Sequence, residues 1–184
     1  FWLAGGAGRP EKLREALAEG ARGVQVGSLF AFCDESGVDE PVKRSVVESA
    51  ARGDLTVFTD PLASPTGYPF KLAQWPGDTA DHETRGRICD LGYLRVAYRM
   101  PEGRIGYRCP AGPVDQFASQ GGDVAETHGR RCLCNALLAT IGHAQKREAG
   151  RIEPPLVTAG DELAHLGDFL QGRTSYTAGD VVDW

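Results

Sequence analysis

Two short apolar segments, each ending in glycine, are the feature of this sequence that most constrains its fold. Residues 1–4 run into Gly5 and Gly6, and residues 23–26 run into Gly27. The residues between the two segments carry apolar side chains at helical spacing and end at a further glycine, as an amphipathic helix does. A connection of roughly 20 residues through a helix favours parallel strands. The pattern therefore predicts an α/β fold for the first part of the chain.

After Gly53 the pattern changes. Prolines and glycines between residues 61 and 77 exclude long regular elements until about residue 85. The other expected elements are helices over residues 10–19, 29–35, 40–51, 113–120, 128–141, 161–171 and 178–184, and strands over residues 55–59 and 105–107. The sequence thus predicts an α/β part over residues 1–53 and a mostly helical and irregular extension over residues 54–184.

Composition excludes several classes of function. The formal net charge is -5 for 184 residues, so the chain lacks the positive charge that drives binding to nucleic acid. The sequence contains neither an apolar run of about 18 residues nor a basic-then-apolar leader, which a membrane helix or a secretory signal requires. We therefore expect a cytoplasmic protein that binds neither nucleic acid nor membrane. Because the chain opens on an apolar strand at Phe1, without methionine, we also expect it to be part of a longer protein.

The glycine-ended strands also predict a binding site. Parallel strands deliver the loops that follow them to one edge of the sheet, where free N–H groups and a helix start attract anions. Gly5, Gly6 and Gly27 could supply N–H groups, and Ser28 an N–H group and a hydroxyl. In (β/α)8 barrels the loops after strands seven and eight commonly hold the phosphate of a cofactor. The alternative is that these glycines only form tight turns between strands and helices.

Two motifs give the chain a resemblance to a known family. Residues 3–8 read LAGGAG, and residues 19–30 read EGARGVQVGSLF. Together they resemble the paired seventh- and eighth-strand signature of nitronate monooxygenases, formerly called 2-nitropropane dioxygenases. Residues 59–71 and 130–142 are similar to the segment that follows the barrel in longer members. The resemblance implies that the chain is the C-terminal portion of such an enzyme, with the last two βα units of a (β/α)8 TIM-type barrel followed by an extension.

The same resemblance implies an activity and a cofactor. Members of the family are FMN-dependent oxidoreductases that oxidise alkyl nitronates with molecular oxygen, so the expected partners are a small nitronate and oxygen. The positions that match the family's grip on the FMN phosphate are Gly5, Gly6, Gly27 and Ser28. The family's histidine base lies upstream of the seventh strand, so no catalytic residue is expected in this chain. We therefore expect the chain alone to be inactive.

The four histidines and the cysteines are expected to play structural roles. His82, His128, His143 and His165 do not fall on the family motif, and we interpret them as surface or packing residues. Cys33 is expected to pack in the helix after the second strand. The other cysteines, Cys89, Cys109, Cys132 and Cys134, could hold zinc or act in redox chemistry, but their separations are irregular and no metal is predicted. In a helix, Cys132 and Cys134 would point about 200° apart and meet only at a frayed helix start.

Two other functions stay open. Another FMN or phosphate-binding barrel, such as an enoyl reductase-like flavoprotein, shares glycine-ended strands, and a metal-stabilised binding module could form around the four clustered cysteines. The aromatic residues of the extension, among them Tyr68 and Trp75, could form a lid over the C-terminal face of a barrel.

Overall fold

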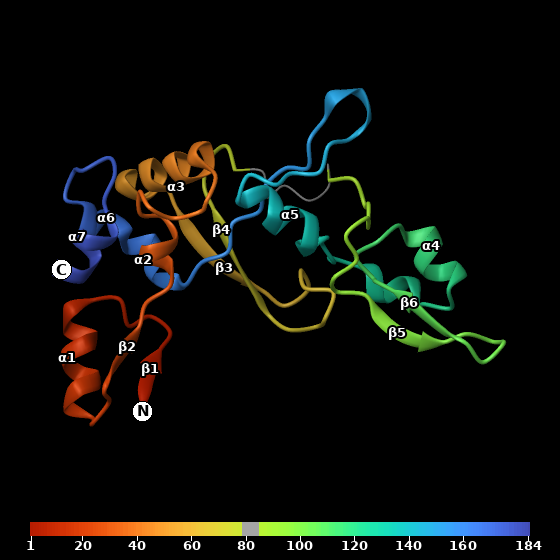
Figure 1. The fold of residues 1–184 in the computed structure, drawn as a ribbon, viewed down its shortest axis with the longest axis horizontal. Helices are drawn as coiled ribbons and strands as arrows, with labels where there is room; N and C mark the ends of the chain where they lie inside the picture. Colours follow the sequence, from red (N-terminus) through yellow and green to blue (C-terminus); the bar gives the residue numbers. More distant parts are fainter. Residues whose placement is uncertain (79–84) are drawn as a thin grey trace. The chain divides into compact units, whose positions relative to one another are not determined.

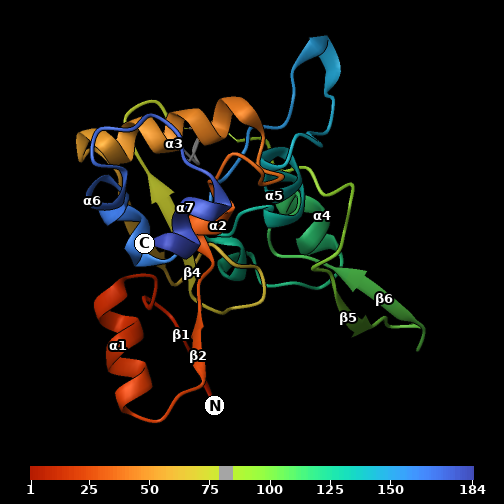
Figure 2. The same ribbon diagram turned by 60° about the vertical axis from the view of Figure 1, so that its left-hand side comes forward.

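The chain forms helices and short two-stranded sheets, as a mixed α/β fold (Figures 1 and 2). The structure is a computed structural model, and it describes residues 1–78 and 85–184. Tertiary contacts divide the chain into two compact units. The first unit contains Phe1–Phe58, Lys71–Asp78 and Val157–Trp184, and the second contains Thr59–Phe70 and Thr79–Leu156.

The first unit begins with the predicted strand, helix and strand. Strand β1 (Trp2–Ala4) is followed by helix α1 (Pro10–Ala18) and strand β2 (Gly23–Gln25), and Figure 2 shows α1 beside the two strands. The strands pair in parallel, with Ala4 opposite Gln25, so the predicted parallel arrangement is confirmed. At Gly23 an added Cβ would lie 2.5 Å from the ring of Trp2, so a larger residue there would require the Trp2 side chain to move.

The core of the first unit lies among short helices from both ends of the chain. They are α2 (Ser28–Ala31), α3 (Glu40–Arg52), a 3-10 turn η3 (Asp161–His165), α6 (Leu166–Leu170) and α7 (Ala178–Asp183). Phe32, Val46 and Leu163 are buried in one apolar cluster with Phe169. Helices α3 and α6 approach closely at Gly167. A Cβ added there would lie only 2.9 Å from the carbonyl oxygen of Ala50. The helices expected over residues 40–51, 161–171 and 178–184 therefore form and pack together, although the second is split.

A second small sheet is only half predicted. Strand β3 (Thr56–Asp60) falls where a strand is expected, but it pairs with β4 (Phe70–Gln74), in a stretch where we excluded long regular elements and predicted no strand. The strand fits because Pro69 directly precedes it and Pro76 lies beyond its end, so neither proline removes an N–H from the ladder. Leu72 is fully buried. The absence of long elements is thus confirmed here, but the short strand itself was not predicted, because its burial is not visible in the sequence.

The second unit contains a hairpin and several short helices. Strands β5 (Val96–Arg99) and β6 (Ile105–Arg108) pair antiparallel, and β6 confirms the strand predicted over residues 105–107. The helical elements are α4 (Val114–Ser119), the 3-10 turns η1 (Val124–Thr127) and η2 (Glu148–Gly150), and α5 (Leu133–Thr140). Helix α4 confirms the prediction for residues 113–120.

Helix α5 is shorter than the helix predicted over residues 128–141, because it begins at Leu133. Gly129 has a φ of +70°, which a regular helix does not allow. The Arg130 guanidinium donates to the carbonyl oxygens of Leu62 and Ser64 at 2.8 and 2.6 Å, and the Arg131 N–H donates to the carbonyl of Ala63 at 3.0 Å. These contacts hold the segment before α5 in an extended path.

Arginine side chains stabilise the second unit by donating to backbone carbonyls. Arg87 donates to the carbonyl oxygens of Gly112 and Thr127 at 3.0 and 3.2 Å, and also to those of Pro110 and Arg130. Three of these carbonyls belong to loops and that of Thr127 to the end of η1, where no regular ladder satisfies them. A single guanidinium thus connects the segment around residues 110–112 with the segment around residues 127–130.

Two predictions concern the whole chain, one about a membrane helix and one about the division of the chain into parts. Within residues 1–78 and 85–184, no helix is long and apolar enough to cross a lipid bilayer. The predicted division at residue 53 separates a barrel part from an extension, and it stays a prediction. The compact units follow contacts instead, so that residues 157–184 belong with the start of the chain.

We expect the Tyr176 hydroxyl to contribute measurably to the stability of the first unit. The buried hydroxyl donates to the Leu29 carbonyl oxygen at 2.7 Å. Tyr176→Phe removes this donor from a buried acceptor and should lower the free energy of unfolding by about 1 to 2 kcal/mol. Denaturant titration followed by circular dichroism measures the loss. Tyr107→Phe is the matched control, since Tyr107 is exposed; equal stabilities of the two variants would contradict the prediction.

Candidate anion site at the glycine turns

The two glycine turns leave the sheet at the same edge. Because Ala4 and Gln25 are partners at the ends of parallel strands, the turn that begins at Gly5 and the turn that contains Gly27 follow from neighbouring positions. The structure therefore brings together two of the segments that the sequence predicted as parts of one site.

The first turn requires glycine for its backbone conformation. Gly5 and Gly6 have φ angles of +87° and +70°, in the left-handed region that other residues rarely adopt. An added Cβ at either position would meet no atom within 4 Å, so space alone does not select glycine here. Two consecutive residues with such angles turn the backbone sharply, which glycine allows without the strain that a Cβ would bring.

The second turn contributes a buried hydroxyl. Ser28 begins α2 and is buried, and its Oγ accepts a hydrogen bond from the N–H of Gly160 at 2.8 Å. Its hydroxyl hydrogen is left to donate to another acceptor. Helix α2 ends at Ala31, earlier than the helix predicted over residues 29–35, because the N–H of Asp34 bonds to the carbonyl of Tyr176 at 2.8 Å. A helix this short has little dipole, so N–H groups and the hydroxyl must supply the attraction.

A carboxylate from the far end of the chain lies against the first turn. Glu162 accepts a hydrogen bond from the N–H of Gly8 at 3.2 Å through its Oε2. An added Cβ on Gly8 would lie 3.1 Å from the same oxygen. The turn therefore already binds an anion, which the chain itself provides. Sequence reasoning missed Glu162 because no local pattern links positions this far apart.

The residues around these turns fit a phosphate group in part. N–H groups and the Ser28 hydroxyl are suitable donors, but the nearby charge is mixed. Arg9 follows the first turn and forms an ion pair with Asp168 at 2.8 Å, while Glu162 adds a negative charge. A bound phosphate would have to displace or neutralise the Glu162 carboxylate. The donors are thus of the chemical kind that a phosphate requires, whereas the negative charge of Glu162 opposes its binding.

An apolar hollow borders the first turn. It has a volume of about 290 Å³ and is lined by Ala7, Gly8, Arg9, Pro10, Leu13 and Arg14, by Val24, Val26 and Phe30, and by Val181, Val182 and Trp184. Two features of the first unit thus adjoin at Gly8, one that attracts anions and one that is apolar.

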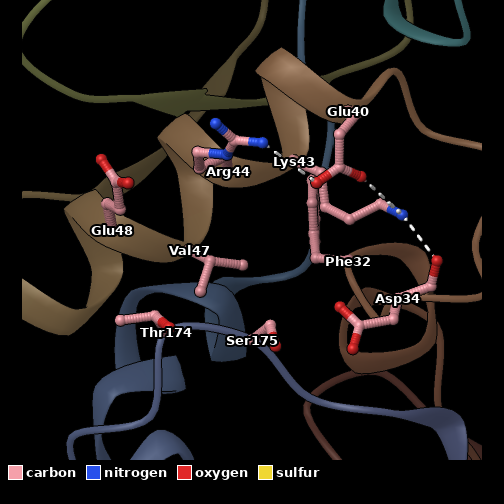
Figure 3. Close-up of a pocket in the computed structure, with 9 residues that line it drawn as sticks. All are labelled: Phe32, Asp34, Glu40, Lys43, Arg44, Val47, Glu48, Thr174 and Ser175. Atoms are coloured by element: carbon pink, nitrogen blue, oxygen red, sulfur yellow. Dashed lines mark hydrogen bonds and ion pairs between the residues drawn. The ribbon is translucent and has the colours of Figure 1, made fainter.

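A second hollow, of about 350 Å³, lies between α3 and residues 174–175 (Figure 3). Three of its charged side chains, those of Glu40, Lys43 and Arg44, face one another in the figure. The buried Lys43 ammonium donates to the carbonyl of Asp34 at 2.9 Å and lies 3.6 Å from the Glu40 carboxylate, which also pairs with Arg44 at 3.7 Å. The carboxylates of Asp34 and Glu48 lie apart from these contacts, so the hollow combines paired charges with two further acidic groups.

The histidines lie where the sequence predicted. His128, His143 and His165 are exposed, in agreement with a surface role, and His82 falls outside the described residues. Cys33 is buried, and its thiol donates to the carbonyl of Phe30 at 3.2 Å, which confirms its packing role. It lies beyond the end of α2 and not in the helix as predicted, because α2 ends at Ala31.

The four remaining cysteines belong to the second unit and are half-buried free thiols. Cys132 precedes the first residue of α5, and the neighbouring Cys134 thiol and burial raise the pKa of its own thiol. In the part of the chain that the structure describes, no three histidine, cysteine or acidic side chains are arranged to bind one metal ion.

Comparison with protein-family models, with curated proteins and with solved structures finds no match to this chain. The resemblance to nitronate monooxygenases therefore rests on the motifs of residues 3–8 and 19–30.

We expect the first turn to depend on the freedom of glycine. Gly6→Ala places a side chain on a backbone with a φ of +70°, which should cost about 1 kcal/mol of stability. Gly37→Ala is the matched control, because Gly37 lies outside the left-handed region and an added Cβ there meets no atom within 4 Å. Thermal unfolding of both variants checks the difference. A Gly6→Ala variant as stable as Gly37→Ala would show that the turn relaxes without strain.

Proposed function

We propose that this chain is the C-terminal part of an FMN-dependent nitronate monooxygenase-like oxidoreductase, which oxidises alkyl nitronates with molecular oxygen. The observation that carries the proposal is the parallel pair β1 and β2, whose glycine turns leave the same edge of the sheet. The family motifs of residues 3–8 and 19–30 coincide with these two turns. In this proposal the two strands are the last two of a (β/α)8 barrel.

The surface of β1, α1 and β2 supports a place in a larger sheet. Parallel strands are normally covered on both faces and continued by further strands. Here Trp2 is 62% exposed, and Leu13 and Leu17 of α1 are also exposed. Apolar residues at these positions are explained if additional barrel strands and helices pack against them.

Within such an enzyme the residues of this chain would bind and orient the cofactor. Gly5, Gly6 and Gly27 would hold the FMN phosphate through N–H groups, and Ser28 through its hydroxyl as well. The isoalloxazine ring of FMN, when bound, supplies the electron transfer between the nitronate and oxygen. The catalytic base and most of the substrate pocket would come from residues that precede Phe1.

The two other functions are less well supported. An enoyl reductase-like flavoprotein would use the same phosphate grip, and it differs from a nitronate monooxygenase in residues upstream of this chain. A cysteine-based metal module requires ligands around a common centre, and among residues 1–78 and 85–184 no such group occurs. The glycine turns favour a flavoenzyme in either case.

The central test uses this chain and the same chain extended by the residues encoded before Phe1. The extended protein should purify yellow, with stoichiometric FMN, and should consume oxygen when an alkyl nitronate is added. The 184-residue chain should show no turnover. Absorbance spectroscopy and an oxygen electrode provide the readouts. An extended protein that is folded, colourless and unable to take up FMN would overturn the proposal.

Glu162 and Ser28 give variants that report on the phosphate grip. In the extended protein, Ser28→Ala should weaken FMN binding roughly tenfold, because it removes a donor to the phosphate. Glu162→Gln should tighten binding by a similar factor, since it removes a negative charge beside the N–H of Gly8. The control is Glu19→Gln, an exposed acid at the end of α1. Riboflavin, which lacks the phosphate, should bind all three variants alike; equal effects on FMN and riboflavin would assign these residues another role.

A further inference from the structure

A small polar hollow in the second unit is lined by two arginines, Arg95 and Arg108. Among the residues that the structure describes, no acid lines it, and its other lining residues are neutral. We call it the arginine hollow. It has a volume of about 120 Å³, whereas pockets for drug-sized ligands usually measure roughly 300 to 1,000 Å³. The arginine hollow therefore suits a small ion.

Both arginines have charge and donors to spare. The Arg95 guanidinium donates to the carbonyl oxygen of Cys89 at 2.6 Å, and the Arg108 guanidinium donates to the carbonyl oxygen of Gln120 at 2.7 Å. Both acceptors are neutral, and each bond uses one of the five N–H donors of a guanidinium. Within residues 1–78 and 85–184, no carboxylate forms an ion pair with either arginine. Positive charge and N–H donors thus remain for a ligand.

Two aromatic rings hold the Arg108 guanidinium in place. Its Cζ lies 4.7 Å from the ring centroid of Tyr98 and 5.2 Å from that of Phe117, and such cation–π contacts are attractive. Tyr98 lies opposite Gly106 in the ladder of β5 and β6. The ring occupies the space that a side chain would take there, since a Cβ added to Gly106 would lie 2.6 Å from it. A donor that is fixed in advance loses less conformational entropy when a ligand binds.

The surrounding sequence is basic although the whole chain is acidic. Residues 91–112 contain four arginines and one glutamate, while the formal net charge of the chain is -5. A local excess of positive charge attracts anions. Guanidinium groups in particular match the oxygens of a phosphate, because two of their N–H groups can donate to two oxygens at once.

We propose that the arginine hollow binds a tetrahedral oxyanion, namely phosphate, either free or as the end of a phosphomonoester. Arg95 and Arg108 donate to its oxygens. The site belongs to the second unit and does not rest on the proposed flavin chemistry, whose phosphate grip lies in the first unit.

A neighbouring hollow bears on the source of the phosphate. It has a volume of about 590 Å³, shares Arg108 and Gln120 with the arginine hollow, and is also lined by Tyr98, Arg99 and Met100. An organic group attached to a bound phosphate would have room there. Phosphate and phenyl phosphate therefore distinguish the two sources: tighter binding of phenyl phosphate assigns the site to a phosphorylated molecule, and equal or weaker binding assigns it to free phosphate.

The test is isothermal titration calorimetry of the 184-residue protein with inorganic phosphate at constant ionic strength. We expect saturable binding, which Arg95→Gln and Arg108→Gln should each weaken roughly tenfold, because each removes charge-assisted hydrogen bonds. Arg104→Gln is the matched control, since Arg104 belongs to the same hairpin and already pairs with Glu102 at 2.8 Å. The proposal is overturned if no saturable binding occurs, if Arg95→Gln and Arg108→Gln bind as the wild type does, or if Arg104→Gln loses as much affinity.

The wild-type protein provides a second measurement, which does not depend on the folding of any variant. Cys89 and Cys109 line the arginine hollow, so bound phosphate should slow their alkylation by iodoacetamide, as followed by peptide mass spectrometry. The slowing should saturate at the phosphate concentrations found by calorimetry. Binding that leaves both rates unchanged would place the phosphate elsewhere, such as at the glycine turns, and would contradict the proposal. Stoichiometric zinc bound to these two cysteines would also contradict it, because the metal would occupy the hollow.

Discussion

The first unit depends on the return of the C-terminal segment to the start of the chain. Residues 157–184 contribute Leu163, Phe169 and Tyr176 to a core whose other half comes from α2 and α3. The Tyr176 hydroxyl bonds to Leu29, and the ring of Phe169 meets that of Tyr176 edge-on at 5.0 Å. Without this segment, the apolar faces of α2 and α3 would be exposed to water. That exposure is unfavourable, because removing apolar surface from water is the main favourable contribution to folding.

The same return shapes the candidate anion site. It brings the N–H of Gly160 to Ser28 and the carboxylate of Glu162 to Gly8. One of these contacts positions a donor, and the other supplies a competing anion. The affinity of such a site for an external phosphate is the difference between the binding free energy of the phosphate and that of the Glu162 carboxylate that it must displace. A phosphate has more charge and more acceptor oxygens than a carboxylate, so that difference favours it when the turn N–H groups converge on it.

The sequence predicted the elements of the first unit better than their contacts. The spacing of apolar residues was sufficient for α1 and α3, and glycine marked the ends of β1 and β2. Strand β4 was missed because Pro69 and Pro76 pointed to a loop, while the burial of Leu72 that favours the strand is a tertiary effect. Glu162 was missed for the same reason, since its partner Gly8 is distant in sequence. The closure of a barrel and the activity stay predictions.

The second unit shows how tertiary contacts can determine a helix boundary. Periodicity alone extended α5 back to residue 128, which would have placed Cys132 and Cys134 on different faces. Arg130 instead donates to carbonyls of residues 62 and 64 and holds the preceding segment out of the helix. Because the helix then begins at Leu133, Cys132 lies outside the helix and Cys134 within it. The arginine-to-carbonyl bonds thus determine where the helix begins, and with it the backbone conformation at Cys132.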